Sequence, residues 1–161
     1  MQKIIILLFL FLGSQCFASP QDSLIERIFS EMYNQHYSRA EEMLRANKDH
    51  IDSVFFAVLS IDMSYWKNVT GTNTPDFPAF ENDLRQLSPT NPTSSTQEAI
   101  LLVNLSYQLR YELKRFKLIK AISTRQETKA LFTSLKTNEE LPPEQQELYQ
   151  LYSALDRKSV V

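Results

Sequence analysis

Glycine is almost absent from this sequence, and its scarcity restricts the possible folds more than any other feature. Only two of the 161 residues are glycine, Gly13 and Gly71. Glycine supplies the backbone conformations of loops that wrap phosphate groups, so a glycine-rich nucleotide-binding loop is excluded. Few glycines suit a mostly helical chain, and no segment alternates apolar and polar residues over the length of a strand. The sequence therefore predicts an all-α fold.

The N-terminus, "MQKIIILLFLFLGSQCFASP", has the order of a secretory signal. One basic residue, Lys3, precedes nine consecutive apolar residues, and small residues come after them. The apolar run is much shorter than the roughly 20 residues that span a bilayer. We expect residues 1–18 to be a signal peptide cleaved after Ala18, and the mature protein to be periplasmic or secreted.

Cys16 is the only cysteine. Bacterial lipoproteins place a modified cysteine after a box in which leucine lies three residues before it, but here Leu12 lies one position too early. Lipidation of Cys16 therefore remains an alternative that would make the chain an envelope lipoprotein. We expect contact with a membrane only in that case.

The last six residues, "DRKSVV" at 156–161, break the preceding helical pattern. They match the translation of a widely used sequencing adapter, so we expect a non-native read-through tail. On this hypothesis the native protein continues beyond Leu155, and a helical-repeat domain covers residues 19–155.

Apolar residues recur at spacings of three and four along most of the chain, which predicts amphipathic helices separated by polar loops such as "SPTNPTSS". Ser38 and Glu41 have the spacing of a capping box at the second helix. No glycine or proline separates the helix expected at about 96–114 from the next one, which includes Ile119 and Ile122 among its apolar residues. The boundary between these two helices is therefore left open. The expected helices cover about residues 19–34, 38–47, 50–69, 78–87, 96–114, 116–135 and 141–155.

The first two helices resemble a hairpin of the tetratricopeptide-repeat (TPR) family. Tyr37, Ala40 and Leu44 match the aromatic, small and large positions of its second helix, and "NQHY" occupies the place of its turn. The resemblance implies antiparallel hairpins stacked as an α-solenoid. A non-repetitive helical bundle is the alternative. This family has no common chemistry, so the resemblance implies no catalytic residue.

Residues that could support catalysis or metal binding are few. The two histidines, His36 and His50, do not form a metal-binding motif, and we expect both to face solvent. No Gly-x-Ser-x-Gly segment marks a nucleophilic serine. We therefore expect neither metal nor cofactor. Because the chain carries a net charge of −2, we expect no binding to nucleic acid.

Asp62 shares helical spacing with Phe55, Leu59 and Trp66, on an apolar and aromatic helix face. A carboxylate in such surroundings needs a partner or access to solvent. Two interpretations are open. Either a ligand or peptide groove includes Asp62, Tyr65, Trp66 and Lys67, or Asp62 accepts a hydrogen bond from a tyrosine or arginine of a neighbouring helix.

A basic run lies in the second half of the chain, where residues 110–136 carry eight basic and two acidic side chains. Three interpretations are open: a solvated face that balances the acidic first half, a groove for acidic partners, or a surface for anionic lipid. Tyr107 and Tyr111 lie beside the run and would suit peptide recognition. The run comprises Arg110, Lys114, Arg115, Lys117, Lys120, Arg125 and Lys129.

These observations favour an exported, non-catalytic scaffold that binds a protein or peptide segment. The alternatives are the N-terminal helical part of a larger exported enzyme and a lipid-anchored envelope protein. The candidate partner-binding residues are Asp62, Tyr65, Trp66, Tyr107, Arg110, Tyr111 and Lys114.

Overall fold

The computed structural model describes residues 20–71 and 74–136, and every regular element in these ranges is helical, which confirms the all-α prediction. The signal peptide, Cys16, the expected helix 141–155 and the tail lie outside the described residues. The elements are α2 (Pro20–Tyr33), α3 (Tyr37–Ala46), a 3-10 turn (Lys48–His50), α4 (Ser53–Tyr65), a π-helical turn (Trp66–Thr70), α5 (Phe77–Leu87), α6 (Ser95–Lys114) and α7 (Leu118–Lys136).

Short polar side chains fix the start of three helices. Asp52 accepts hydrogen bonds from the backbone N–H groups of the first turn of α4, and Asp76 and Ser94 do the same for α5 and α6. The capping box expected at Ser38 and Glu41 is wrong. Helix α3 begins one residue earlier, and His36 at its N-cap makes no side-chain capping bond. Glu41 forms ion pairs with Arg45 and Lys67 instead.

The turns of α2–α3 and α6–α7 share one backbone geometry. Gln35 and Phe116 both adopt a left-handed conformation, with φ of 62° and 54°. In each turn this residue donates its N–H to the carbonyl three residues back, and the next residue donates to the carbonyl five residues back. This is the Schellman geometry that ends many helices, usually on glycine. Phe116 thus supplies the boundary between α6 and α7 that the sequence pattern left open.

The second helix of each of these hairpins also carries a buried alanine at the same place. Ala40 and Ala121 each lie five residues after the left-handed residue, and both are buried against neighbouring helices. A methyl side chain at this position lets two helices approach closely, as the resemblance to the TPR family implies for Ala40. The α2–α3 and α6–α7 hairpins therefore share a turn geometry and the position of a buried alanine.

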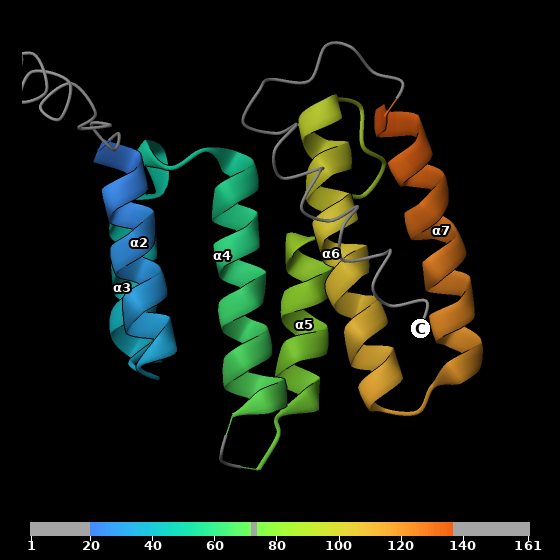
Figure 1. Cartoon of the computed structure of the whole chain (residues 1–161), viewed down its shortest axis with the longest axis horizontal. Coiled ribbons are helices and arrows are strands. Elements are labelled where there is room, and N and C mark those ends of the chain that lie inside the picture. The colour runs from blue at the N-terminus through green and yellow to red at the C-terminus, as the bar shows by residue number, and fades with distance from the viewer. Residues whose placement is uncertain (1–19, 72–73, 137–161) are drawn as a thin grey trace, which may run out of the picture.

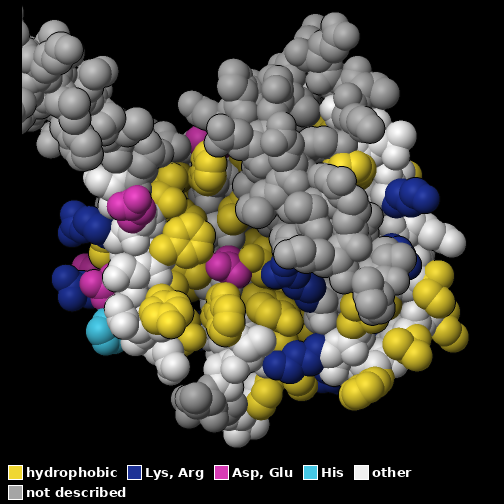
Figure 2. All heavy atoms as spheres, viewed as in Figure 1, with side chains coloured by type: hydrophobic (Ala, Val, Ile, Leu, Met, Phe, Trp, Pro, Cys, Tyr) yellow, Lys and Arg dark blue, Asp and Glu magenta, His cyan; other side chains and the backbone are white. Residues whose placement is uncertain are grey.

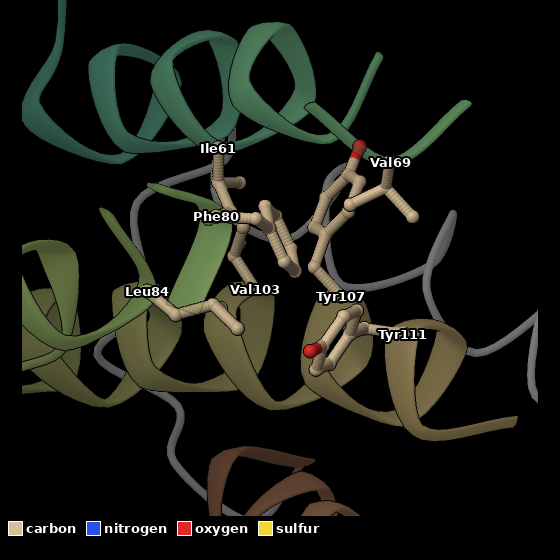
Figure 3. Close-up of a cluster of buried hydrophobic side chains, with 7 residues drawn as sticks. All are labelled: Ile61, Val69, Phe80, Leu84, Val103, Tyr107 and Tyr111. Carbon is tan, nitrogen blue, oxygen red and sulfur yellow. The ribbon is translucent and has the colours of Figure 1, made fainter. Parts of the chain in front are cut away.

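Helix α4 is the centre of the molecule. It contacts α3, α5 and α6, so this largely apolar helix is enclosed by its neighbours. In Figure 1, α2, α4, α6 and α7 succeed one another across the view, and α3 lies behind α2. One core cluster joins α2, α3 and α4. A second, drawn in Figure 3, joins α4, α5 and α6 through Ile61, Val69, Phe80, Leu84, Val103, Tyr107 and Tyr111. A third joins α6 and α7 through Leu102 and Leu135.

Part of the expected apolar face of α7 is wrong. Ile119 and Ile122 face solvent, and Ala121 and Thr124 are buried instead, while Leu135 near the end of the helix is buried. Phe29 on α2 is also exposed. No helix in the described part of the chain is both long enough and apolar enough to cross a bilayer.

Candidate functional site

The seven candidate residues lie on two neighbouring helices. Asp62 and Tyr65 are on α4, and Trp66 opens the π-helical turn that continues it. The other four lie on α6, which packs against α4, so residues far apart in sequence come together. Residues 62 and 66, like 107, 110 and 114, are spaced so that each set shares one side of its helix.

Asp62 accepts a hydrogen bond from the Tyr107 hydroxyl at 2.5 Å, across the contact between α4 and α6. This confirms the expectation that Asp62 is paired with a tyrosine or arginine of a neighbouring helix. Burial raises the pKa of the Asp62 carboxyl, while hydrogen bonds from Tyr107 and Trp66 and the charge of Arg110 act in the opposite direction. Asp62 is thus held among three of the other candidate residues.

The three tyrosines belong to the core beneath the surface. The Tyr65 ring meets the rings of Phe80 and Tyr107 edge to face, with centroids 5.5 and 5.6 Å apart. Tyr107 and Tyr111 are buried, and their hydroxyl groups point in different directions in Figure 3. The structure therefore places the tyrosine rings under the candidate surface, where they support it.

Tyr111 also connects α6 to α5. Its hydroxyl donates a hydrogen bond to the Glu81 carboxylate at 2.5 Å. Burial and this negatively charged partner raise the pKa of Tyr111 to about 12, and the bond holds the pKa of Glu81 below its usual value. At neutral pH the pair is therefore a phenol bonded to a carboxylate.

Trp66, Arg110 and Lys114 reach the surface. Trp66 is 50% exposed although it touches a half-buried carboxylate. The Arg110 guanidinium lies over the Tyr107 ring, 5.1 Å from its centroid. Lys114 donates a hydrogen bond to the carbonyl of Val69 at 2.7 Å, which ties α6 to the end of the π-helical turn.

Figure 2 shows that hydrophobic side chains gather over α4 and its borders with α2 and α6, with an acidic side chain among them and basic side chains at the α6 border. Helix α2 carries two exposed aromatic residues, Phe29 and Tyr33. We call the surface formed by Asp62, Trp66 and Arg110 the aromatic face.

The rest of the basic run divides into paired and solvated side chains. Lys117 forms an ion pair with Glu81 at 3.3 Å, and the Arg115 guanidinium lies 4.2 Å from the centroid of the Phe77 ring. Lys120, Arg125 and Lys129 are exposed along α7. Part of the run thus binds the start of α7 to the acidic helix α5.

Both histidines face solvent, as expected, and His36 contacts Glu31 at 2.9 Å. Within residues 20–71 and 74–136, no group of three or more His, Cys, Asp or Glu side chains is arranged to hold a metal ion.

A pocket of about 240 Å³ lies elsewhere, between α3, α4 and α5. Its polar wall includes Asp83, which accepts a hydrogen bond from Ser64 at 2.5 Å, and Asn68, which donates to Ser64. No sequence motif marks these residues, because the pocket exists only where three helices meet. The bond between Ser64 and Asp83 also joins α4 to α5.

Comparison of the chain with models of protein families, with curated proteins and with solved structures gives no match.

Proposed function

We propose that the chain is an exported, non-catalytic scaffold of the TPR type that binds a peptide or protein segment on the aromatic face. The solenoid part of this proposal is supported by three successive helix pairs, α2–α3, α4–α5 and α6–α7, in which each pair contacts the next. It is further supported by the equivalent turns at Gln35 and Phe116 and by the buried alanines that come after them.

The observation that carries the binding proposal is the exposure of Trp66 beside Asp62 and Arg110. A large aromatic side chain that remains half in water next to anchored charged groups resembles the residues that contribute most to protein interfaces. Tyr107 is bonded to Asp62 and lies under the Arg110 guanidinium, so these side chains are held in place before any ligand arrives. Such preorganisation reduces the entropy lost on binding.

The chemistry of the face defines the ligand. Trp66 offers apolar contact, while Arg110 offers an exposed guanidinium for a carboxylate. Asp62 already accepts bonds from Tyr107 and Trp66 and therefore has less capacity for a basic group. The ligand that fits is a peptide segment with a bulky apolar side chain close to an acidic group.

Selection from a displayed peptide library against the whole chain tests the proposal. We expect enrichment of peptides that combine apolar and acidic residues. Trp66→Ala and Arg110→Glu should each weaken binding of the selected peptides by about tenfold or more, measured by fluorescence anisotropy of labelled peptide. Arg125→Glu is the matched control, since it makes the same charge change on α7, away from the face. The proposal would be contradicted if no peptide were enriched. It would also be contradicted if Trp66→Ala, Arg110→Glu and the control Arg125→Glu all bound the selected peptides equally well.

A further inference from the structure

The turn between α6 and α7 exposes five large apolar side chains on 10 successive residues, from position 113 to position 122. Phe116 stands at the left-handed position of the turn with its side chain in solvent. The exposed fractions are 47% for Leu113, 85% for Phe116, 58% for Leu118, 87% for Ile119 and 61% for Ile122. We call these five residues the apolar tip.

The fold does not require apolar residues at three of these positions. The α2–α3 turn has the same geometry, and residues 81 positions apart are equivalent, since Gln35 corresponds to Phe116. Ser38 corresponds to Ile119 and Glu41 to Ile122. At the other two tip positions both hairpins are apolar, since Met32 corresponds to Leu113 and Tyr37 to Leu118. Turn formation therefore does not account for the apolar side chains at positions 116, 119 and 122.

Basic side chains surround the tip without acidic neighbours on the same segment. Residues 113–126 contain five Lys or Arg and no Asp or Glu. Glu112, directly before them, is buried and accepts hydrogen bonds from Thr124 and Gln108. From the neighbouring helix α5, Glu81 forms an ion pair with Lys117 and also interacts with the charge of Arg115. Lys114, Arg115, Lys120 and Arg125 remain exposed to solvent.

We propose that the apolar tip inserts into the surface of a bilayer that contains anionic phospholipids. Exposed aliphatic and aromatic side chains within a cluster of Lys and Arg are the combination that binds such surfaces, through apolar burial and attraction to lipid headgroups. This contact does not need a lipid on Cys16, and it takes up the interpretation of the basic run as a surface for anionic lipid.

Two other occupants fit the surface less well. A symmetric contact between two copies of the tip would bring two sets of basic side chains together and repel. A helix laid along the outer side of α7 would meet mostly polar side chains beyond Ile122, namely Ser123, Gln126, Lys129 and Thr133, all exposed. The apolar side chains are confined to the end of the molecule, which suits insertion of that end.

Co-sedimentation with vesicles tests the proposal on the whole chain. We expect binding to vesicles of phosphatidylcholine mixed with phosphatidylglycerol, weaker binding to phosphatidylcholine alone, and loss of the difference at high salt. The variant Phe116→Ser/Ile119→Ser should lower partitioning into anionic vesicles by about tenfold or more, and Lys120→Glu/Arg125→Glu by a similar factor.

Tyr33→Ser is the matched control, because it removes an equally exposed aromatic side chain on α2. It should leave vesicle binding unchanged. All variants have the same N-terminus, so a difference in vesicle binding between them arises from the substituted side chains. Circular dichroism should show the same helix content in each, since the changed side chains are exposed.

Three outcomes would overturn the proposal. They are no preference of the wild type for anionic vesicles, equal binding by the Phe116→Ser/Ile119→Ser variant, and concentration-dependent self-association that this variant abolishes while vesicle binding persists. The last result would identify a second copy as the occupant. None of them affects the peptide-binding proposal, whose test uses Trp66 and Arg110 on another part of the surface.

Discussion

The hydroxyl of Tyr107 donates a hydrogen bond to the carboxylate of Asp62, 45 residues earlier in the chain, and so joins α6 to α4 at a fixed register. Both partners also touch the residues that reach the surface: Asp62 contacts Trp66, and Tyr107 lies under Arg110. One interhelical bond thus positions the exposed part of the aromatic face.

Tyr107→Phe removes this donor while it keeps the ring in the core. We expect a loss of about 1–2 kcal/mol in the free energy of unfolding, because a half-buried carboxylate loses a hydrogen bond. Urea denaturation measures the change. Tyr33→Phe is the matched control on an exposed tyrosine and should change stability by less than about 0.5 kcal/mol. Equal effects of the two substitutions would show that the bond contributes nothing net.

Asp62→Asn tests the raised pKa of Asp62. When the folded-state pKa lies above the unfolded value of 3.8, the folded protein binds more protons in that interval. The contribution of Asp62 to the free energy of unfolding should therefore be fully present below pH 3.8. It should be lost as the pH rises through the folded-state pKa. The asparagine variant lacks this contribution, so its stability relative to the wild type should increase over the same interval. Denaturation at a series of pH values gives the difference. A constant difference would contradict the raised pKa.

Phe116→Gly should stabilise the protein. Phe116 adopts a left-handed conformation that costs an L-residue about 1–2 kcal/mol, and its exposed side chain contributes little burial. Part of the gain is offset by the greater flexibility of glycine in the unfolded chain, so we expect a net gain of about 0.5–1 kcal/mol.

Lys120→Gly is the control for this substitution. It lies four residues later inside α7, where glycine should destabilise by about 1 kcal/mol. Thermal or urea unfolding compares the two variants. If both were destabilising, the turn would not have the described geometry.

Ala121→Leu tests whether the two hairpins are equivalent. Ala121 and Ala40 are buried at matching positions, and neither site can hold the larger leucine side chain without displacing a helix. We expect each leucine variant, at 40 or 121, to lose about 1–3 kcal/mol of stability. Ala130→Leu makes the same change on the exposed side of α7 and should be nearly neutral. Tolerance of leucine at 121 but not at 40 would show that the hairpins pack differently.

Local patterns predicted most of the helices. The loops around Gly71 and around "SPTNPTSS" separate them, and helix α5 lies within one residue of its expected start at Pro78. The pairing of Asp62 was also predictable, because a lone carboxylate on an apolar helix face requires a partner. Which tyrosine would supply the hydroxyl was not, since Tyr107 reaches Asp62 only after α6 has packed on α4.

For residues 20–71 and 74–136, the sequence by itself determined that the chain is helical and roughly where each helix lies, because spacing, turn formers and low glycine content act within one or two turns of backbone. The tertiary structure decided which apolar residues are buried. Ile119 and Ala121 lie on the same helix, yet Ile119 faces solvent and Ala121 is enclosed. Periodicity shows that a helix has an apolar side, but burial depends on whether a neighbouring helix reaches that side.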